Sequence, residues 1–190
     1  MPDLNLISHP LTPDRWGDLE SLFGPKGACG GCWCMFWRLS RSDYERMKGS
    51  ENRRRFKELI SGGEIPGLLA YQDDKPVGWV SVGPREQFPL LERSKVLARV
   101  DEQEVWSVVC FFIDRSVRGQ GVATFLLKSA LDFARQRGAQ VVEGYPTPTK
   151  EKKIPDAFAW TGPETVFQQL GFRLMERRGK SNRGIYRYYF

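Results

Sequence analysis

The residues of this chain whose types and spacing suggest chemistry lie in one short glycine-rich segment. They are Arg118, Gly119, Gln120, Gly121, Val122 and Ala123. Glycine lets a backbone approach a ligand closely, and the first turn of a helix presents unpaired N–H groups and the positive end of the helix dipole. Since Gly in the first turn of a helix costs about 0.5–1 kcal/mol relative to Ala, its presence favours a functional reason. The segment therefore predicts an anion site, such as a phosphate site.

The residues on either side predict the strand and helix that such a site needs. Val105 to Ile113 is a nearly unbroken apolar run, with the length and composition of a strand covered on both faces. After the glycines, small and apolar residues recur at the 3.6-residue spacing of one buried helix face. These residues are Ala123, Leu126, Leu127, Ala130, Leu131 and Ala134. A strand, a glycine-rich turn and a helix together form a phosphate-binding device.

Two other phosphate-binding motifs are excluded by the spacing. No Gly is followed by Lys-Ser or Lys-Thr as a P-loop requires, and Gly119-Gln120-Gly121 lacks the third glycine of a dinucleotide fingerprint. The pattern that fits is R-x-x-G-x-A with a Gly after the Arg. It closely resembles the pyrophosphate-binding motif of the GNAT superfamily of acyl-CoA-dependent N-acyltransferases. The predicted element order, β-α-α-β-β-β-α-β-α-β-β, is also similar to that of the family.

The resemblance extends over most of the chain and implies a single domain, residues 1–190, of the α/β class. The expected fold is a mixed, mostly antiparallel sheet with helices on both sides. The expected activity is direct transfer of an acetyl group from acetyl-CoA to a primary amine of a small molecule or peptide. The resemblance implies that Phe111, Phe112 and Ile113 hydrogen-bond the pantetheine arm and the thioester carbonyl through their backbone, and that Arg118 to Ala123 bind the pyrophosphate. We expect no resident metal.

Direct transfer also needs a base for the amine and an acid for the departing thiolate. Many family members carry a Tyr as the acid four residues before a Gly-Phe pair, but this chain has Phe167 before Gly171-Phe172. Three readings stay open: the proton comes from water or another side chain, Tyr145 supplies it, or the protein is a non-catalytic acyl-CoA-binding or sensing module. Glu104 lies near the position of a catalytic carboxylate in some members, and Glu102 is chemically equivalent.

Another unusual segment runs from Gly24 to Leu39 and is rich in Gly, Cys and aromatic residues. Its thiols Cys29, Cys32 and Cys34 fall short of the four ligands of a zinc site, and no thioredoxin-type arrangement surrounds the C-x-x-C pair. In the family the corresponding segment forms one wall of the acceptor site. By that resemblance its aromatic residues line an acceptor pocket, and the alternative is that they fill the core. These residues are Trp33, Phe36 and Trp37.

Composition and charge limit the remaining possibilities. The chain has 41% hydrophobic and 27% charged residues and no apolar run near the ~20 residues that cross a bilayer. Its beginning, MPDLNLISHP, lacks the features of a signal peptide, so we expect a cytoplasmic protein with no membrane partner. The net charge of +6 is spread without a nucleic-acid-binding motif, so we expect no nucleic-acid partner.

Four further expectations concern local structure. Ser42 or Asp43 is expected to cap one helix that reaches Ile60. The stretch from Pro146 to Ile154 reads as an exposed loop. The terminal strand, Ile185 to Phe190, is expected to be exposed at a sheet edge, where it could pair across a homodimer. Glu143 lies inside a predicted covered strand and would need a partner there.

Overall fold

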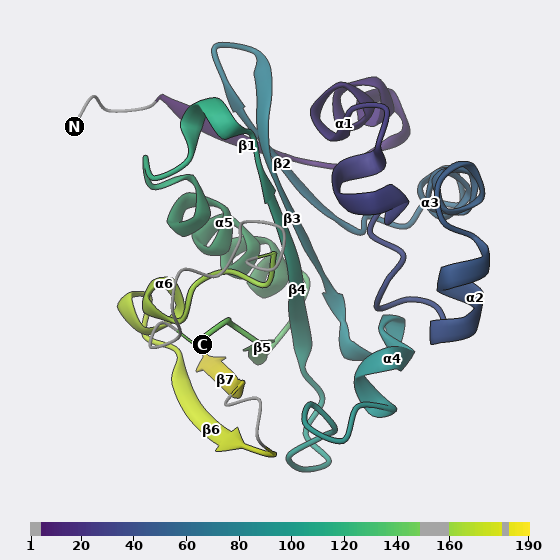
Figure 1. The fold of residues 1–190 in the computed structure, drawn as a ribbon. Helices are drawn as coiled ribbons and strands as arrows, with labels where there is room; N and C mark the ends of the chain where they lie inside the picture. Colours follow the sequence, from purple (N-terminus) through teal and green to yellow (C-terminus); the bar gives the residue numbers. More distant parts are fainter. Residues whose placement is uncertain (1–4, 149–159, 180–182) are drawn as a thin grey trace.

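The computed structural model describes residues 5–148, 160–179 and 183–190 (Figure 1). In these parts of the chain, seven strands form one sheet in the order β1-β2-β3-β4-β5-β7-β6. The strands are β1 (Leu6–Pro10), β2 (Gly67–Gln72), β3 (Lys75–Pro84), β4 (Trp106–Ile113), β5 (Val141–Gly144), β6 (Arg173–Arg177) and β7 (Gly184–Tyr189). β4 and β5 run parallel and the other neighbours run antiparallel. The predicted mixed, mostly antiparallel sheet is confirmed.

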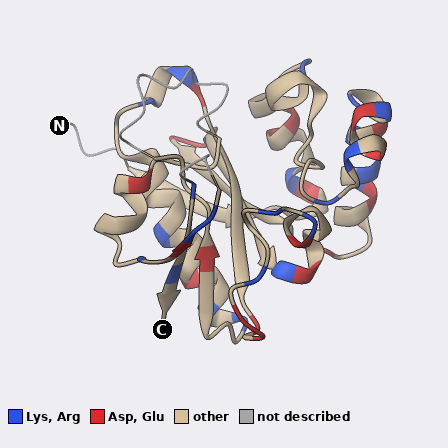
Figure 2. Cartoon of the chain, turned by 60° about the horizontal axis from the view of Figure 1, so that its bottom comes forward, with Lys and Arg blue, Asp and Glu red and all other residues tan. Residues whose placement is uncertain are grey.

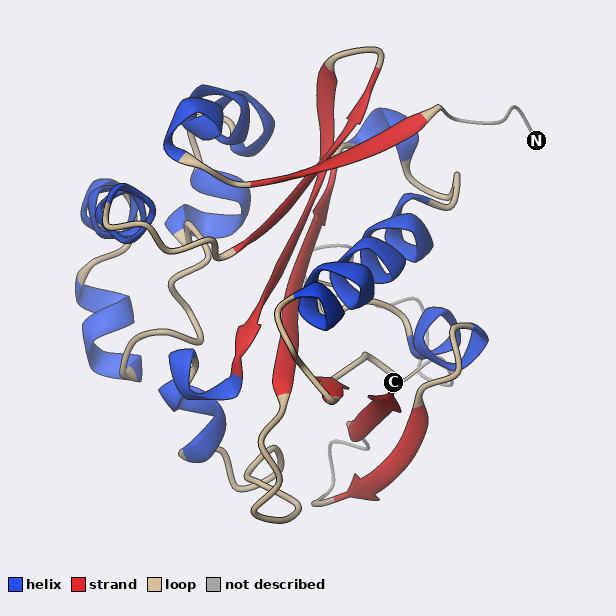
Figure 3. Cartoon of the chain, turned by 180° about the vertical axis from the view of Figure 1, so that it is seen from behind, coloured by secondary structure: helices blue, strands red, loops and turns tan. Residues whose placement is uncertain are grey.

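Helices lie on both sides of this sheet, as predicted. They are α1 (Trp16–Phe23), α2 (Arg41–Arg46), α3 (Ser50–Ser61), α4 (Pro89–Glu92), α5 (Val122–Gln136) and α6 (Glu164–Gln169). Figures 1 and 3 show α1 to α4 on one side of the sheet and α5 with α6 on the other. No helix in the described ranges is long and apolar enough to cross a membrane.

The helix after the glycine-rich segment packs closely on the centre of the sheet. Its buried face includes Leu126, Leu127 and Ala130, which confirms the predicted periodicity. It lies over Gly78 of β3, where an added Cβ would be 2.9 Å from Leu126 Cδ1 and 3.0 Å from Val122 Cγ1. The absence of a side chain at Gly78 therefore lets α5 approach the sheet closely and fixes the position of the helix N-terminus.

The expected single helix from Ser42 to Ile60 is wrong, because the structure has two helices there. The cap of α2 is Ser40, whose hydroxyl accepts a hydrogen bond from the Asp43 amide at 3.1 Å. Gly49 has a φ of +88°, which an α-helix does not allow, and α3 begins immediately after it. In Figure 2, basic and acidic residues intermix along these helices, as in the pair between Arg54 and Glu51.

The expectation that the terminal strand is an exposed edge is also wrong. β7 lies between β5 and β6, and its Tyr186 and Arg187 are opposite Gly144 and Glu143 of β5. The edges of the described sheet are β1 and β6, so β7 has no free edge for a second copy. The described beginning of the expected loop after β5, residues 146–148, is buried, and the rest of that loop lies outside the described residues.

Candidate functional site

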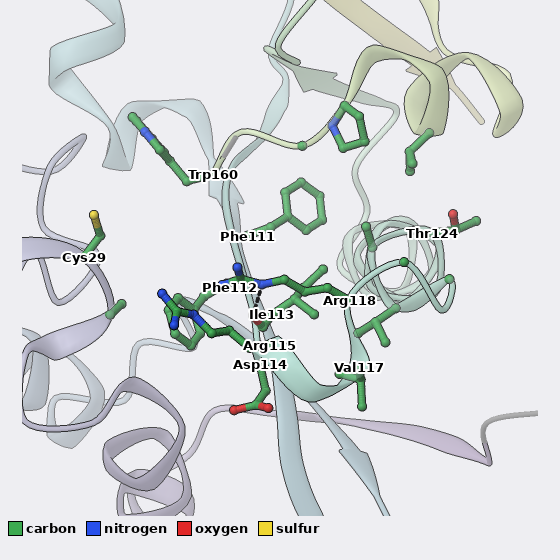
Figure 4. Close-up of a pocket in the computed structure, with 18 of the residues that line it drawn as sticks. Cys29, Phe111, Phe112, Ile113, Asp114, Arg115, Val117, Arg118, Thr124 and Trp160 are labelled. Atoms are coloured by element: carbon green, nitrogen blue, oxygen red, sulfur yellow. Dashed lines mark hydrogen bonds between the residues drawn. The ribbon is translucent and has the colours of Figure 1, made fainter. Parts of the chain in front are cut away.

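A cavity of about 860 Å³ lies between the end of β4 and the start of α5 (Figure 4). Its lining includes eight of the nine residues predicted to bind the cofactor. These are Phe111, Phe112, Ile113, Arg118, Gly119, Gly121, Val122 and Ala123. The ninth, Gln120, is exposed, and its side-chain amide donates to the Ser116 carbonyl at 3.0 Å. The structure thus places the apolar strand and the glycine-rich segment around one space.

The glycines of this segment are required by the backbone conformation. Gly119 and Gly121 have φ of +74° and +86°, values that side chains other than glycine rarely adopt. An added Cβ at either position would meet nothing within 4 Å, so packing does not exclude a side chain there. Gly121 is also the N-cap of α5 and supplies no side-chain acceptor. The first-turn N–H groups of α5 therefore have no capping side chain and are available to an anion.

The charged residues of the cavity add to this positive helix end. Arg115 and Arg118 both line it, and the Arg118 Nε–H donates to the Ile113 carbonyl at 3.1 Å. Asp114 also lines the cavity, and hydrogen bonds from Ser116 hold the pKa of its carboxyl below the usual range. Two guanidinium groups and one carboxylate, together with the helix dipole, leave a positive balance that suits a phosphate group.

The cavity exists because β4 extends beyond its parallel neighbour. β5 pairs with β4 only from Trp106 to Val108, and further along the Phe111 amide donates to the Trp160 carbonyl at 2.6 Å. Since peptide groups alternate along a strand, the Ile113 peptide faces the same side as that of Phe111, while that of Phe112 faces β3. The open side of β4 therefore presents backbone groups of Phe111 and Ile113. The Phe111 amide already donates to Trp160, and the Ile113 carbonyl already accepts from Arg118.

Neither of the two predicted catalytic residues lines this cavity. Glu104 is exposed, just before β4 begins at Trp106. Tyr145 is fully buried, and its hydroxyl contacts Ser107 Oγ at 2.8 Å and accepts from Arg85 at 2.6 Å. Burial and the neighbouring Glu143 carboxylate raise the pKa of Tyr145 well above its ordinary value. A buried phenol with these partners does not favour the acid role.

The Tyr145 hydroxyl belongs to a buried ionic network that the sequence indicated only through Glu143. Glu143 accepts hydrogen bonds from Arg85, Arg187 and Tyr145, each at 2.8 Å. Arg85 also donates to the Leu97 carbonyl at 2.7 Å. Because Arg85 precedes α4 and Arg187 lies in β7, the network connects the end of β5 with the segment before α4 and with β7. It is a structural element beside the cavity.

The three predicted acceptor-wall aromatic residues are divided between two places. The rings of Phe36 and Trp37 lie 5.4 and 5.7 Å from that of Trp160, which lines the cavity. Trp37 also donates its indole N–H to the Val109 carbonyl of β4 at 3.2 Å. Trp33 instead stacks on Trp16 at 5.8 Å within the core between α1, α3 and the sheet. Phe36 and Trp37 thus adjoin the cavity, whereas Trp33 is a core residue.

Among the lining residues that were not predicted as cofactor or catalytic residues, one stretch comes from the first loop of the chain. Ala28, Cys29 and Gly30, in the loop after α1, form the wall opposite the start of α5 (Figure 4). The density of Gly and Cys residues was the signal, but it carried no information on which of them faces a cavity. In the described parts of the chain, no three His, Cys, Asp or Glu side chains gather in a way that could hold a metal ion.

Comparison with known proteins agrees with the fold. A family model described as the acetyltransferase (GNAT) family matches residues 33–149. An uncharacterized N-acetyltransferase of Methanocaldococcus jannaschii is 27% identical over 88 residues, which make up 46% of this chain and 34% of the relative. The match thus spans about a third of the length of that relative.

Solved structures resemble the whole fold at low identity. The PaiA N-acetyltransferase of Thermoplasma acidophilum, in complex with coenzyme A, has a TM-score of 0.55 at 11% identity over 98% of this chain and 99% of its own. The polyamine N-acetyltransferase of Drosophila melanogaster has a TM-score of 0.51 at 11% identity over 98% and 100% of the two chains. Because the family model covers more than half of the chain and includes the strand, the glycine-rich segment and the helix around the cavity, this protein belongs to the GNAT acetyltransferase family.

Proposed function

We propose that the protein is an N-acetyltransferase that uses acetyl-CoA as co-substrate and acetylates a primary amine of a small molecule or peptide by direct transfer. The observation that carries this proposal is the cavity between β4 and α5. It combines two glycines of positive φ, an uncapped helix N-terminus and Arg118 with an apolar strand end. A ligand with a diphosphate and a long uncharged arm matches these features, with the diphosphate at the helix N-terminus and the arm along the end of β4.

The residues present fit such a cofactor. The space next to Gly119 and Gly121 would be filled by a side chain at either position, and the first-turn amides of α5 would donate to the pyrophosphate. Arg118 would add a charge-assisted hydrogen bond. When bound, acetyl-CoA supplies the thioester carbonyl that an amine attacks. The Ile113 peptide on the open side of β4 would orient the pantetheine arm, and Phe111 would contact it through its ring.

The proton transfers form the second part of the proposal. Phe167 is fully buried and packs on Phe172 at 5.0 Å and on Phe111 at 6.2 Å, so this position offers only hydrocarbon. We therefore propose that the leaving thiolate takes its proton from water. Glu104 is exposed to solvent and remains our candidate base through a water path. Tyr145 is the weaker candidate acid because its hydroxyl lies in the buried network.

The proposed acceptor is an amine with an apolar or cationic portion. Phe36 and Trp37 pack against Trp160, which lines the cavity. Aromatic faces attract both apolar groups and ammonium or guanidinium groups. Two solved structures of similar fold are named as an agmatine N-acetyltransferase and as a polyamine N-acetyltransferase that forms N-acetylagmatine. Agmatine, polyamines and peptides with a free amino terminus are therefore the first acceptors to test.

A second candidate function is a non-catalytic acyl-CoA-binding or sensing module. The observation that favours it is the pair of unsuitable acid positions, Phe167 with no hydroxyl and Tyr145 sealed in the core. Release of free thiol from acetyl-CoA in the presence of the amine panel separates the two functions. Turnover with any amine supports the transferase. Tight binding of acetyl-CoA without turnover across the panel supports the binding module.

The cavity assignment itself is tested with two glycines of the same helix. Gly121→Glu places bulk and negative charge at the start of α5, and Gly138→Glu makes the same change at its other end. Both glycines have a φ of +86°, and an added Cβ meets nothing within 4 Å at either site. The free-energy cost of placing a non-glycine residue in the left-handed region, about 1–2 kcal/mol, is therefore the same for the two variants. We expect Gly121→Glu to abolish acetyl-CoA binding in calorimetry and Gly138→Glu to leave it unchanged. Equal affinities of the two variants would contradict the proposed cofactor site.

A further inference from the structure

The wall of the cavity opposite α5 is formed by a segment with an unusual backbone. Of the five non-glycine residues with positive φ in the described parts of the chain, three lie here: Ala28 at +67°, Trp33 at +42° and Cys34 at +55°. Such conformations cost free energy and persist where the surrounding structure enforces them, often at functional sites. The same segment carries Cys29 and Cys32, and neither thiol has a role in the proposed acetyl transfer.

Contacts with the start of α3 hold this segment in place. The Gly49 amide donates to the Gly31 carbonyl at 3.0 Å, and the side-chain amide of the fully buried Asn52 donates to the same carbonyl at 3.3 Å. The two glycines approach so closely that a Cβ on Gly31 would lie 2.5 Å from the Gly49 nitrogen. The turn that carries the thiols is therefore anchored at its second glycine.

The turn brings Cys29 and Cys32 within reach of each other. The Cys32 amide donates to the Cys29 carbonyl at 3.1 Å, and the residues between them, Gly30 and Gly31, have φ of +58° and +76°. A turn closed by this bond keeps the outer Cα atoms within about 7 Å, and disulfides join Cα atoms about 4.4–6.8 Å apart. The turn therefore holds the two Cα atoms at a spacing close to the range that a disulfide joins.

The two thiols have different surroundings. Cys29 is exposed and lines the cavity, where a small molecule can reach it. Cys32 is half-buried, and its thiol donates to the Gly27 carbonyl at 3.6 Å. Burial, with the neighbouring Cys34, raises the pKa of Cys32 to about 11, so it remains a thiol at neutral pH. An accessible attacking thiol and a protected second thiol are the two parts of an exchange site.

The remaining thiols are placed less favourably for such chemistry. Cys34 is buried, and its sulfur accepts the indole N–H of Trp79 at 3.0 Å. Cys110 lies in β4 beside Cys34, and that thiol, together with burial, raises the pKa of Cys110 well above its ordinary value. These two sulfurs lie between the helices and the sheet, away from the cavity lining. Cys34 and Cys110 therefore serve as a comparison pair for the reactivity of Cys29 and Cys32.

We propose that Cys29 and Cys32 form a thiol–disulfide exchange site in the wall of the cavity, which takes low-molecular-weight disulfides and prefers the disulfide of CoA. Cys29 loses its proton to water and attacks one sulfur of the small disulfide. The S–S bond breaks, and the first small thiol leaves with a proton from water. Cys32 then deprotonates and attacks the Cys29 sulfur, which releases the second small thiol. Two protein thiols are oxidised and one small disulfide is reduced to two thiols, so no other oxidant is needed.

The exchange site goes beyond the proposed acetyl transfer and does not depend on it. Only the preference of the site for CoA disulfide rests on the proposed cofactor cavity. The test incubates the reduced protein with glutathione disulfide and, separately, with CoA disulfide, followed by intact mass and peptide mapping. We expect the loss of two hydrogens, a Cys29–Cys32 link and its reversal by dithiothreitol. Cys32→Ser should stop at the mixed disulfide on Cys29, and Cys29→Ser should form neither product. Cys110→Ala is the matched control and should react as the wild type does.

The outcomes separate the exchange site from the cofactor site. A link between Cys34 and Cys110, or no link with either reagent in the wild-type protein, overturns the proposal. A Cys29–Cys32 link formed with glutathione disulfide supports it even if CoA does not bind. Binding in the cavity should make CoA disulfide react at least about tenfold faster than glutathione disulfide, and Arg118→Ala should remove that advantage. Equal rates overturn the preference for CoA and count against the cofactor site as well.

Discussion

The buried network around Glu143 allows a sharp test of how β5, β7 and the segment before α4 are held together. The Glu143 side chain is 1% exposed and accepts hydrogen bonds from Arg85 and Arg187, whose side chains are 0% and 1% exposed. Glu143→Gln keeps the shape of the side chain and removes its charge. It also turns an N–H₂ group toward the donors of Tyr145 and the two arginines. Two buried guanidinium groups then lose their shared carboxylate.

The expected loss of stability follows from these contacts. Removal of one partner of a buried ion pair costs about 3–5 kcal/mol, because it leaves an uncompensated buried charge. Arg85 keeps its ion pair with Glu92 at 2.6 Å and its bond to the Leu97 carbonyl. Arg187 keeps two bonds to Asp101 at 2.7 and 2.8 Å, so we expect the lower end of this range. For a chain of this size, a loss of about 3 kcal/mol lowers the unfolding midpoint by roughly 6–12 °C.

The assay is thermal unfolding followed by circular dichroism, with urea unfolding as an independent measure of the same free energy. Glu51→Gln is the matched control, because Glu51 also pairs with two arginines, Arg54 and Arg55, but on the exposed face of α3. The control should leave the midpoint nearly unchanged, since exposed pairs contribute little. Equal midpoints for Glu143→Gln and the control would refute the assignment of a stabilising role to the buried charge.

Three further outcomes are expected. Hydrogen bonds from Arg187 lower the pKa of Asp101 from 3.8 to about 2, so the stability contributed by Asp101 is present above its unfolded value and is lost as the pH falls through about 2. Urea midpoints measured from about pH 5 to pH 2 should therefore fall less steeply for Asp101→Asn than for the wild type. Arg118→Ala should weaken CoA binding about 10- to 100-fold in calorimetry, because a charge-assisted hydrogen bond contributes about 1.5–3 kcal/mol, whereas Arg135→Ala in the last turn of α5 should not. Trp37→Phe removes an indole hydrogen bond to β4 beside the cavity, and in steady-state kinetics it should raise the KM for the amine more than that for acetyl-CoA.

The parts of the fold that follow local rules were predicted from the sequence. The apolar run before the glycines is β4, and the 3.6-residue periodicity after them is the buried face of α5. Gly119 and Gly121 marked the turn because positive φ excludes most other residues. The element order was also correct, apart from two differences. Gly49 divides an expected helix into α2 and α3, and the short helix α4 lies between β3 and β4.

The parts that depend on long-range pairing were not predicted. Glu143 was expected to need a partner, but Arg85 is 58 positions away and Arg187 is 44 positions away, and nothing local identifies either of them. The sequence pattern of β7 shows that it is a strand but not which strands it joins. For the same reason, the Gly and Cys content of the first loop did not reveal that Cys29, in particular, faces the cavity.

The place of β7 in the sheet has a consequence for how the chain is made. β7 follows β5 and β6 in the chain but lies between them, so during synthesis on the ribosome the two earlier strands emerge before the strand that joins them. Until then, β5 has an open edge and Glu143 lacks Arg187. A chain that stops before residue 184 would keep both defects: the edge of β5 would stay unpaired, and Glu143 would keep Arg85 but lack the second of its two arginines. An open strand edge of this kind favours aggregation or degradation over folding. The late strand thus makes the completion of the fold depend on the completion of this part of the chain.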